Sequence, residues 1–298
     1  MKTKIHDPLA CSRPASFFIH LSMLVICLTA FLPFLSEIAK SLSFPTQVDS
    51  GFVTFWPRQF TFGNYQYLGN YPILLRIFAN TVFVTVIGTC WTTFMTAMMA
   101  YPLSRPRREF PAGPAVMLFL LITMVFSNPL IPYYIAIRKY GMMDSLIKSL
   151  ILTQTLSGFI AILVMLYFKD LEEELFDAAR MDGAGDFRLF IMIALPLSKA
   201  VLAATAVFNA LAYWNMFLHP MMFIRSSELM VLQPFVRSIF SSTGDVGSKT
   251  TQYIRNPFAD KDSMKSALTV LSTLPIILVY PLLQKYFIQG MRLGAIKG

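Results

Sequence analysis

The chain has 298 residues, of which 55% are hydrophobic and 14% are charged, and it carries a formal net charge of +9. Soluble domains contain about 25% charged residues, so this composition excludes an ordinary soluble protein. The three cysteines have no paired spacing and the three histidines are scattered, which indicates neither a disulfide framework nor a metal site.

Apolar segments long enough to cross a bilayer recur along the chain. A helix needs about 20 apolar residues to span the hydrocarbon core, and we expect six transmembrane helices, at Phe17 to Ile38, Ile77 to Leu103, Pro114 to Ile137, Leu146 to Phe168, Ala200 to Ile224 and Ala267 to Ile288. The first is longer than the apolar core of a signal peptide, about 7 to 15 residues, and is expected to be retained. Pro129 and Pro132 are expected to break the third helix. The sequence therefore predicts an all-α integral membrane protein, with one transmembrane domain over residues 1–298.

The distribution of basic residues predicts the orientation, because Lys and Arg in short flanks stay on the cytoplasmic side. The basic stretch Arg105–Arg108 favours a cytoplasmic second connection, although Arg138 belongs to a short basic connection that this orientation leaves outside. Both termini are then cytoplasmic, as is a net acidic connection at 169–199. The connection at 225–266 is external, and the external connections together are net basic.

The acidic connection has the pattern of two short helices joined by a turn. A 3.6-residue period with acidic residues in the first turn indicates an amphipathic helix, formed by Leu171, Leu175, Ala178, Ala179 and Asp182. Gly183 and Gly185 supply backbone freedom for a sharp turn, and the residues from Phe187 to Ile193 predict a second helix that ends before Pro196. Such a segment either docks a partner protein or lies on the membrane surface, and the pattern alone favours neither.

The same connection carries a motif. Asp177-Ala178-Ala179, followed by Asp182-Gly183-Ala184 and by Leu195-Pro196-Leu197, closely resembles the EAA loop of ABC import permeases. The resemblance implies that this loop forms coupling helices seated in a cleft of an ATPase subunit, through Asp177, Ala178, Ala179, Asp182, Gly183, Ala184, Leu195 and Pro196. The family has Glu where Asp177 stands, so the charge is kept and its reach is shortened.

Further matches extend the resemblance over most of the chain: Asn80-Thr81, Gly141 with Asp144, and Trp214-Asn215 with Pro220. Together they are similar to the carbohydrate-uptake permeases typified by the second membrane subunit of the maltose importer. Within that group the chain is most similar to permeases for oligosaccharides derived from polysaccharides, including alginate and rhamnogalacturonan. The resemblance implies the type I ABC importer permease fold in the inner membrane. It also implies a second permease subunit, two ATPase subunits that use ATP and Mg²⁺, and an extracytoplasmic solute-binding protein as partners.

A permease of this kind needs no catalytic residue and no cofactor of its own. The nearest match to a phosphate-binding loop, Gly244 to Thr250, has Ser248 in place of the glycine before the lysine, which departs from the motif. We therefore expect no enzyme activity from this chain. Two rival interpretations stay open: a secondary transporter, which should carry ionisable residues within its spans, and a non-transport scaffold that recruits another protein through the acidic connection.

Polar residues inside the predicted spans indicate either a substrate path or helix packing. Aromatic faces suit sugar rings and amides suit sugar hydroxyls, and the candidates are Asn80, Asn128, Tyr133, Tyr134, Asn209, Tyr213, Trp214 and Asn215. Hydrogen bonds between helices and an interfacial aromatic belt are the alternative interpretation.

The external connection at 225–266 contains a polar, turn-rich stretch from Ser241 to Pro257 without an apolar period, which predicts a flexible loop. The resemblance implies that this loop reaches into the binding protein, and the candidate contacts are Ser242, Thr243, Gly244, Asp245 and Lys249. The net basic exterior is compatible with an acidic sugar, such as an alginate or pectin fragment. Solvated loop charges without a ligand are the alternative.

Overall fold

The computed structural model of the chain describes residues 13–126, 129–241 and 262–295, and all regular structure within these ranges is helical. The chain divides into two compact units. One comprises Met1–Asn70 and Asn256–Ser272, and the other comprises Tyr71–Arg255 and Thr273–Gly298. The expectation of an all-α protein is confirmed for the described residues.

The smaller unit contains α1 (Arg13–Ser41), α2 (Pro45–Asp49), α3 (Gly63–Gly69) and the start of α14 (Asp262–Ala295). The buried Asn64 fixes the end of α1, because its amide donates hydrogen bonds to the carbonyls of Ser41 at 2.8 Å and Ser43 at 3.1 Å. The large apolar side chains of α1 between Phe17 and Leu32 are exposed, as suits a helix surrounded by lipid.

The larger unit contains the remaining helices: α4 (Pro72–Ser104), α5 (Gly113–Val125), α6 (Leu130–Lys139), the π-helical η1 (Leu146–Ile151), the 3-10 turn η2 (Leu152–Gln154), α7 (Gly158–Lys169), α8 (Glu173–Met181), α9 (Asp186–Leu189), the π-helical η3 (Phe190–Ala194), α10 (Leu195–Leu197), α11 (Lys199–Trp214), α12 (Leu218–Phe223), the 3-10 turn η4 (Ser227–Leu229), α13 (Leu232–Ser241) and the rest of α14.

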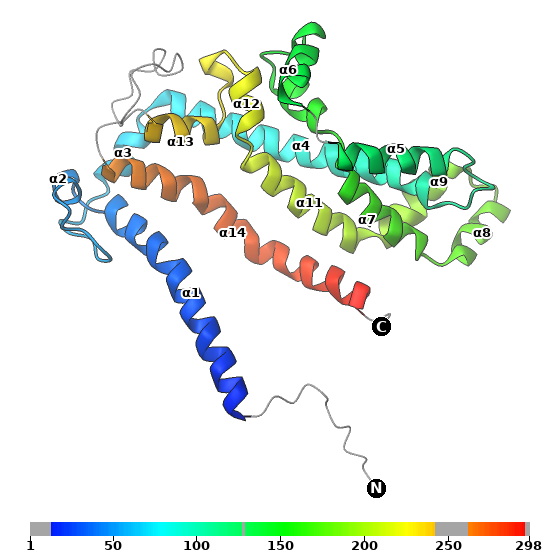
Figure 1. The fold of residues 1–298 in the computed structure, drawn as a ribbon, viewed down its shortest axis with the longest axis horizontal. Helices are drawn as coiled ribbons and strands as arrows, with labels where there is room; N and C mark the ends of the chain where they lie inside the picture. The colour runs from blue at the N-terminus through cyan, green and yellow to red at the C-terminus, as the bar shows by residue number, and fades with distance from the viewer. Residues whose placement is uncertain (1–12, 127–128, 242–261, 296–298) are drawn as a thin grey trace. The chain divides into compact units, whose positions relative to one another are not determined.

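The long helix α4 is the centre of the larger unit, and α7 and α11 pack along it (Figure 1). At 1.5 Å per residue its 33 residues extend about 50 Å, which exceeds the ~30 Å hydrocarbon core. Gly88, Ala97 and Ala100 of α4 are buried, and small side chains of this kind let neighbouring helices approach. Figure 1 shows α8 and α9 toward the C-terminal end of α4, and α12 and α13 toward its N-terminal end.

Among the described residues, three helical stretches are long and apolar enough to cross a membrane by themselves: Ala15–Ser41, Pro72–Ser104 and Asp262–Val279. Three further candidates are pairs of helices joined at a sharp bend: α5 with α6 at 118°, η1 and η2 with α7 at 55°, and the helical segment Asp186–Leu197 with α11 at 82°. The expected break is confirmed at Pro129, because α5 ends at Val125 and α6 begins at Leu130, whereas Pro132 lies in the first turn of α6 and does not break it.

Two further predicted spans are not continuous helices. The segment predicted over Leu146 to Phe168 passes from a π-helix into a 3-10 turn and breaks before α7 begins at Gly158. The segment predicted over Ala200 to Ile224 ends as a helix at Trp214, and α12 starts again at Leu218. Pro220 lacks the amide hydrogen that one continuous helix would need there, so it lies in the first turn of a new helix instead.

Two helical segments extend beyond the predicted ones. Within the connection at 225–266, α13 was not predicted, although its buried Leu232, Phe235 and Ile239 follow the spacing of one helical face. In the acidic connection, the second helix does not end before Pro196, which lies inside α10. The π-helical segment η3 directly precedes this proline. A π-helix does not use the i to i−4 hydrogen bonds of an α-helix, which are the bonds that a proline interrupts.

Candidate functional site

The acidic segment, residues 169–199, packs one side chain deeply against α4. Phe176 of α8 is fully buried, its ring centroid lies 6.3 Å from that of Tyr101, and the guanidinium carbon of Arg105 lies 4.0 Å from the same ring. The predicted amphipathic helix is therefore confirmed. The buried face of this helix, however, centres on Phe176, whereas Leu175 and Ala178 are exposed. The spacing of the apolar residues is compatible with two neighbouring faces of the helix, and the sequence pattern did not distinguish them.

Helix α8 ends in a turn that requires glycine. Gly183 has a φ of +81°, in the left-handed region that side chains disfavour. The amide of Ala184 donates to the carbonyl of Ala179 at 3.0 Å, as in a Schellman motif. Gly185 has an ordinary φ of −76°, and α9 starts at the next residue. The predicted glycine turn between two helices is thus confirmed.

The exposed side of this segment combines acidic and apolar side chains. Met181 is 89% exposed and Phe187 is 67% exposed, and Asp177, Ala178 and Asp182 are exposed as well. We name these five residues the coupling face. Of the other predicted coupling residues, Ala179, Ala184 and Leu195 pack on the core and Pro196 is exposed. Large apolar side chains left exposed on a polar loop are typical of an interaction surface.

Arg180 connects α8 with the chain that follows α4. Its guanidinium forms an ion pair with Glu109 and a second with Asp177, where the nearest atoms are 3.1 Å apart. Burial lowers the pKa of Arg180, but the carboxylates of Glu109 and Asp177 outweigh this effect and raise that pKa above its ordinary value. Arg180 therefore stays charged, and it links α8 directly to the connection between α4 and α5.

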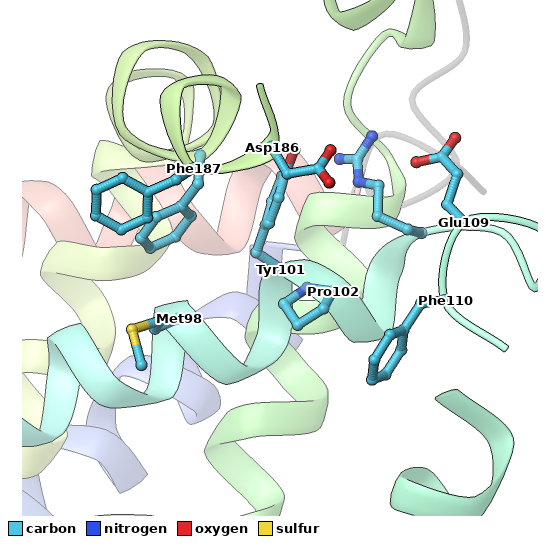
Figure 2. Close-up of a pocket in the computed structure, with 9 residues that line it drawn as sticks. Met98, Tyr101, Pro102, Glu109, Phe110, Asp186 and Phe187 are labelled. Atoms are coloured by element: carbon cyan, nitrogen blue, oxygen red, sulfur yellow. The ribbon is translucent and has the colours of Figure 1, made fainter. Parts of the chain in front are cut away.

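A small pocket of 250 Å³ lies between α4 and the start of α9. Figure 2 shows Met98, Tyr101 and Pro102 along α4, with Asp186 and Phe187 facing them. Ligand sites usually have volumes of about 300–1,000 Å³. This pocket is smaller and partly lined by acidic side chains, so it suits water better than a sugar.

A second pocket, of 390 Å³, lies between α11, α12 and the break before α7, and we name it the amide pocket. Asn209 and Tyr213, two of the predicted path residues, line it together with Gln154 and His219, which the sequence did not indicate. The Nε2 atoms of Gln154 and His219 are 2.6 Å apart. None of the lining residues in the described part of the chain is charged. Amide, imidazole and phenol groups thus lie beside the ring of Phe217, a combination that fits sugar hydroxyls and faces.

Side chains hold the break before α7 in place of helix hydrogen bonds. The Thr92 hydroxyl donates to the carbonyl of Gln154 at 3.3 Å, and it lies 2.8 Å from the Tyr213 hydroxyl. The Trp91 indole donates to the Thr155 hydroxyl at 2.9 Å. Non-helical backbone at membrane depth is tolerated where it lines a cavity, and the amide pocket lies at this break.

Four further predicted path residues lie on other surfaces. Tyr133 packs behind the amide pocket, with its ring centroid 5.8 Å from that of the pocket histidine, and the Tyr134 hydroxyl accepts a hydrogen bond from Arg225 at 3.1 Å. Trp214 lines a separate apolar pocket formed by α4, α11 and α14, and the Asn215 amide bonds to its own helix. The structure therefore brings Asn209 and Tyr213 together and leaves these four outside the amide pocket.

Asn80 and Asp144 hold the segment between α12 and α13 by its backbone, and we name them the backbone clamp. The Asn80 amide donates to the carbonyls of Glu228 at 2.8 Å and Met230 at 3.0 Å, so both of its donor hydrogens are engaged. Asp144 has a φ of +55°, and its carboxylate accepts from the two amides of Arg225–Ser226 at 3.0 and 2.9 Å. Asn80, predicted for the substrate path, does not line the amide pocket.

Several predicted site residues lie outside the described residues. They are Asn128 of the predicted path and Ser242, Thr243, Gly244, Asp245 and Lys249 of the predicted contact with a binding protein. The near match to a phosphate-binding loop at 244–250 lies there too. Their roles stay predictions.

Comparison with known proteins finds relatives along nearly the whole chain. The chain is 34% identical to Protein LplC of Bacillus subtilis (strain 168), over 90% of this chain and 89% of that protein. It is 32% identical to the polygalacturonan/rhamnogalacturonan transport system permease protein YtcP of the same organism, over 93% and 96%. A bacterial ABC transporter involved in the import of the acidic polysaccharide alginate has a similar fold, with a TM-score of 0.82 and 26% identity over 93% of this chain and 99% of that chain. The family model for the binding-protein-dependent transport system inner membrane component matches residues 73–293, and the chain therefore belongs to this family.

Proposed function

We propose that the chain is a permease subunit of an ATP-driven ABC importer that carries an oligosaccharide across the inner membrane. It acts with a second permease subunit, with two ATPase subunits that use ATP and Mg²⁺, and with an extracytoplasmic solute-binding protein. The family membership and the names of the relatives support this proposal, because YtcP and the alginate transporter are named for polysaccharide-derived sugars. A secondary transporter or a scaffold would not belong to this family.

The proposed topology keeps the six spans expected from the sequence, with α5 and α6 forming the third, η1, η2 and α7 the fourth, and α11 with α12 the fifth. Both termini, the coupling face and the connection at 105–112 then lie in the cytoplasm. The basic stretch Arg105–Arg108 directly after α4 supports this orientation. Residues 169–199 are the cytoplasmic coupling loop of a single transmembrane domain, and residues 225–266 form an external loop that contacts the binding protein.

The coupling face carries the proposal. An acidic segment that exposes Met181 of α8 and Phe187 of α9 while burying Phe176 presents one side to a partner and packs the other on its own core. A movement of an ATPase subunit would pass from the coupling face through Phe176 and Arg180 into α4 and α5. The amide pocket, at the break before α7, is the proposed part of the sugar path that this movement opens and closes.

The test compares two glycines on the same turn. A Cβ added to Gly183 or to Gly185 would meet no atom within 4 Å, but only Gly183 has a positive φ. Gly183→Val should therefore distort the turn and release the ATPase subunits, whereas Gly185→Val should retain them and Gly183→Asn, which tolerates this φ, should retain most. The measurement is co-purification of the ATPase subunits with a tagged permease. Equal retention by both valine variants would contradict docking through this turn.

ATP-dependent uptake by the same preparations separates the rival functions. A secondary transporter would take up sugar without ATPase subunits, and a scaffold would retain its partner without taking up sugar. Deleting Ser242 to Thr250 should impair uptake while the ATPase subunits stay bound, if this stretch contacts the binding protein. Unchanged uptake would contradict the proposed contact between this stretch and the binding protein.

A further inference from the structure

This inference rests on the proposed function. We propose that Arg237 recognises a carboxylate of the transported sugar at the wall of the amide pocket, so that the importer prefers an oligosaccharide of uronic acids over a neutral one of the same length. Arg237 would then be the residue of this chain that determines the charge of the substrate.

The position of Arg237 follows from the amphipathic helix α13. Leu232, Phe235 and Ile239 are buried on one side of the helix, and Arg237 is exposed. Its guanidinium carbon lies 4.7 Å from the ring centroid of Phe217. Phe217 lines the amide pocket and Arg237 does not, so the positive charge contacts a residue of the pocket wall.

The charge of Arg237 is not balanced by a carboxylate in the described part of the chain. Arg76 pairs with Glu228 at 3.5 Å and Arg180 pairs with Glu109, whereas Arg237 forms no ion pair with any described residue. The amide pocket has no charged lining residue that would cancel its field. An uncompensated positive charge beside a neutral pocket favours a negatively charged ligand.

The chemistry of a guanidinium that contacts an aromatic ring favours a carboxylate as its ligand. Stacking on an aromatic ring fixes the guanidinium plane and leaves the N–H groups in that plane free to form two parallel hydrogen bonds with a carboxylate. A neutral sugar can use Gln154, Asn209 and His219 for its hydroxyls, but it offers no countercharge. Removing the guanidinium from water without a countercharge is unfavourable, so the neutral sugar gains less.

The experiment uses the complete importer, reconstituted in proteoliposomes with its binding protein. It compares kcat/KM for uptake of a uronic acid trisaccharide and of the same trisaccharide after reduction of its carboxyl groups to alcohols. Arg237→Gln should lower the ratio of acidic to neutral uptake by about 10- to 100-fold, the range for one lost charge-assisted hydrogen bond. Arg237→Lys should restore part of the ratio, since it keeps the charge but not the planar fork. Every variant uses the same binding protein, whose own preference cancels in the comparison.

Arg76→Gln is the matched control, because the charge of Arg76 is already paired with Glu228, and it should leave the ratio unchanged. The proposal is overturned if Arg237→Gln leaves both rates unchanged, or lowers both equally, as loss of a contact with the binding protein or of folding would do. If the wild-type importer takes up neither trisaccharide while its ATPase subunits are bound, the sugar-permease function itself fails. If it takes up both and Arg237→Gln does not change their ratio, only the acidic preference fails.

Discussion

Gly88 lets α4 approach the ring of Tyr213, and one added methyl group at this position should push that ring out of place. A Cβ built on Gly88 would lie 2.6 to 2.8 Å from three ring carbons of Tyr213, far inside the optimal carbon–carbon separation of about 3.5–4.0 Å. The ring has little room to retreat, because Tyr213 is only 4% exposed and its hydroxyl lies 2.8 Å from that of Thr92. The structure therefore predicts a clash that the surroundings cannot absorb.

We expect Gly88→Ala to destabilise the permease by about 1–3 kcal/mol. Overpacking a filled interior costs about 1–3 kcal/mol, and losing the Thr92 contact costs about 1 kcal/mol more. Alanine stabilises a helix by about 1 kcal/mol relative to glycine, and this gain offsets only the lost hydrogen bond. Uptake should fall with stability, because the displaced Tyr213 lines the amide pocket.

The assay is thermal unfolding of the detergent-solubilised importer. A change of 1 kcal/mol shifts the midpoint by about 2–4 °C for a domain of this size, so a drop of roughly 2–12 °C is expected. Gly69→Ala in α3 is the matched control, since its Cβ would meet no atom within 4 Å. In a Tyr213→Leu background, Gly88→Ala should no longer destabilise. Equal loss in both backgrounds would refute the clash with the tyrosine ring.

Three further predictions test the acidic segment 169–199 and the backbone clamp. Arg180→Glu or Glu109→Arg alone should lower ATP-driven uptake more than ATPase binding, and the double reversal should restore uptake; no recovery would mean that the ion pair does not transmit movement. Phe176→Ala should cost about 3–5 kcal/mol and reduce co-purification of the ATPase subunits, whereas Phe176→Leu should keep them, and full retention by the alanine variant would contradict a structural role in docking. Asp144→Ala should lower the unfolding midpoint by the equivalent of about 1–3 kcal/mol, while Asp144→Asn, which accepts the same bonds and tolerates a positive φ, should lower it less; identical midpoints would argue against the clamp.

Hydropathy predicted where apolar helices lie better than where they break. The run from Ala200 to Ile224 reads as one span because apolar residues continue through Met216 and Phe217. The helix nevertheless ends at Trp214, since its continuation would meet Pro220, which is the third residue of α12 and lacks an amide hydrogen. Hydropathy measures side chains, whereas a helix ends where its backbone hydrogen bonds end.

The candidate site was predictable where it depends on local sequence. The turn at Gly183 follows from its motif, but the link between Arg180 and Glu109 joins residues 71 positions apart, and no local pattern indicates such a pair. Gln154 and His219 carry no spacing signal either, because they meet only through the break before α7. The polar run from Thr153 to Ser157 inside an apolar segment was the one sign of that break.

The backbone clamp has a consequence for how such a permease can diverge. Asn80 grips two carbonyls and Asp144 grips two amides, and every residue type supplies a carbonyl while every type except proline supplies an amide. The exposed side chains of Arg225 and Glu228 can therefore change in size and charge while these four bonds persist. Relatives with different partners can therefore substitute these exposed side chains while they keep the four hydrogen bonds that hold the backbone.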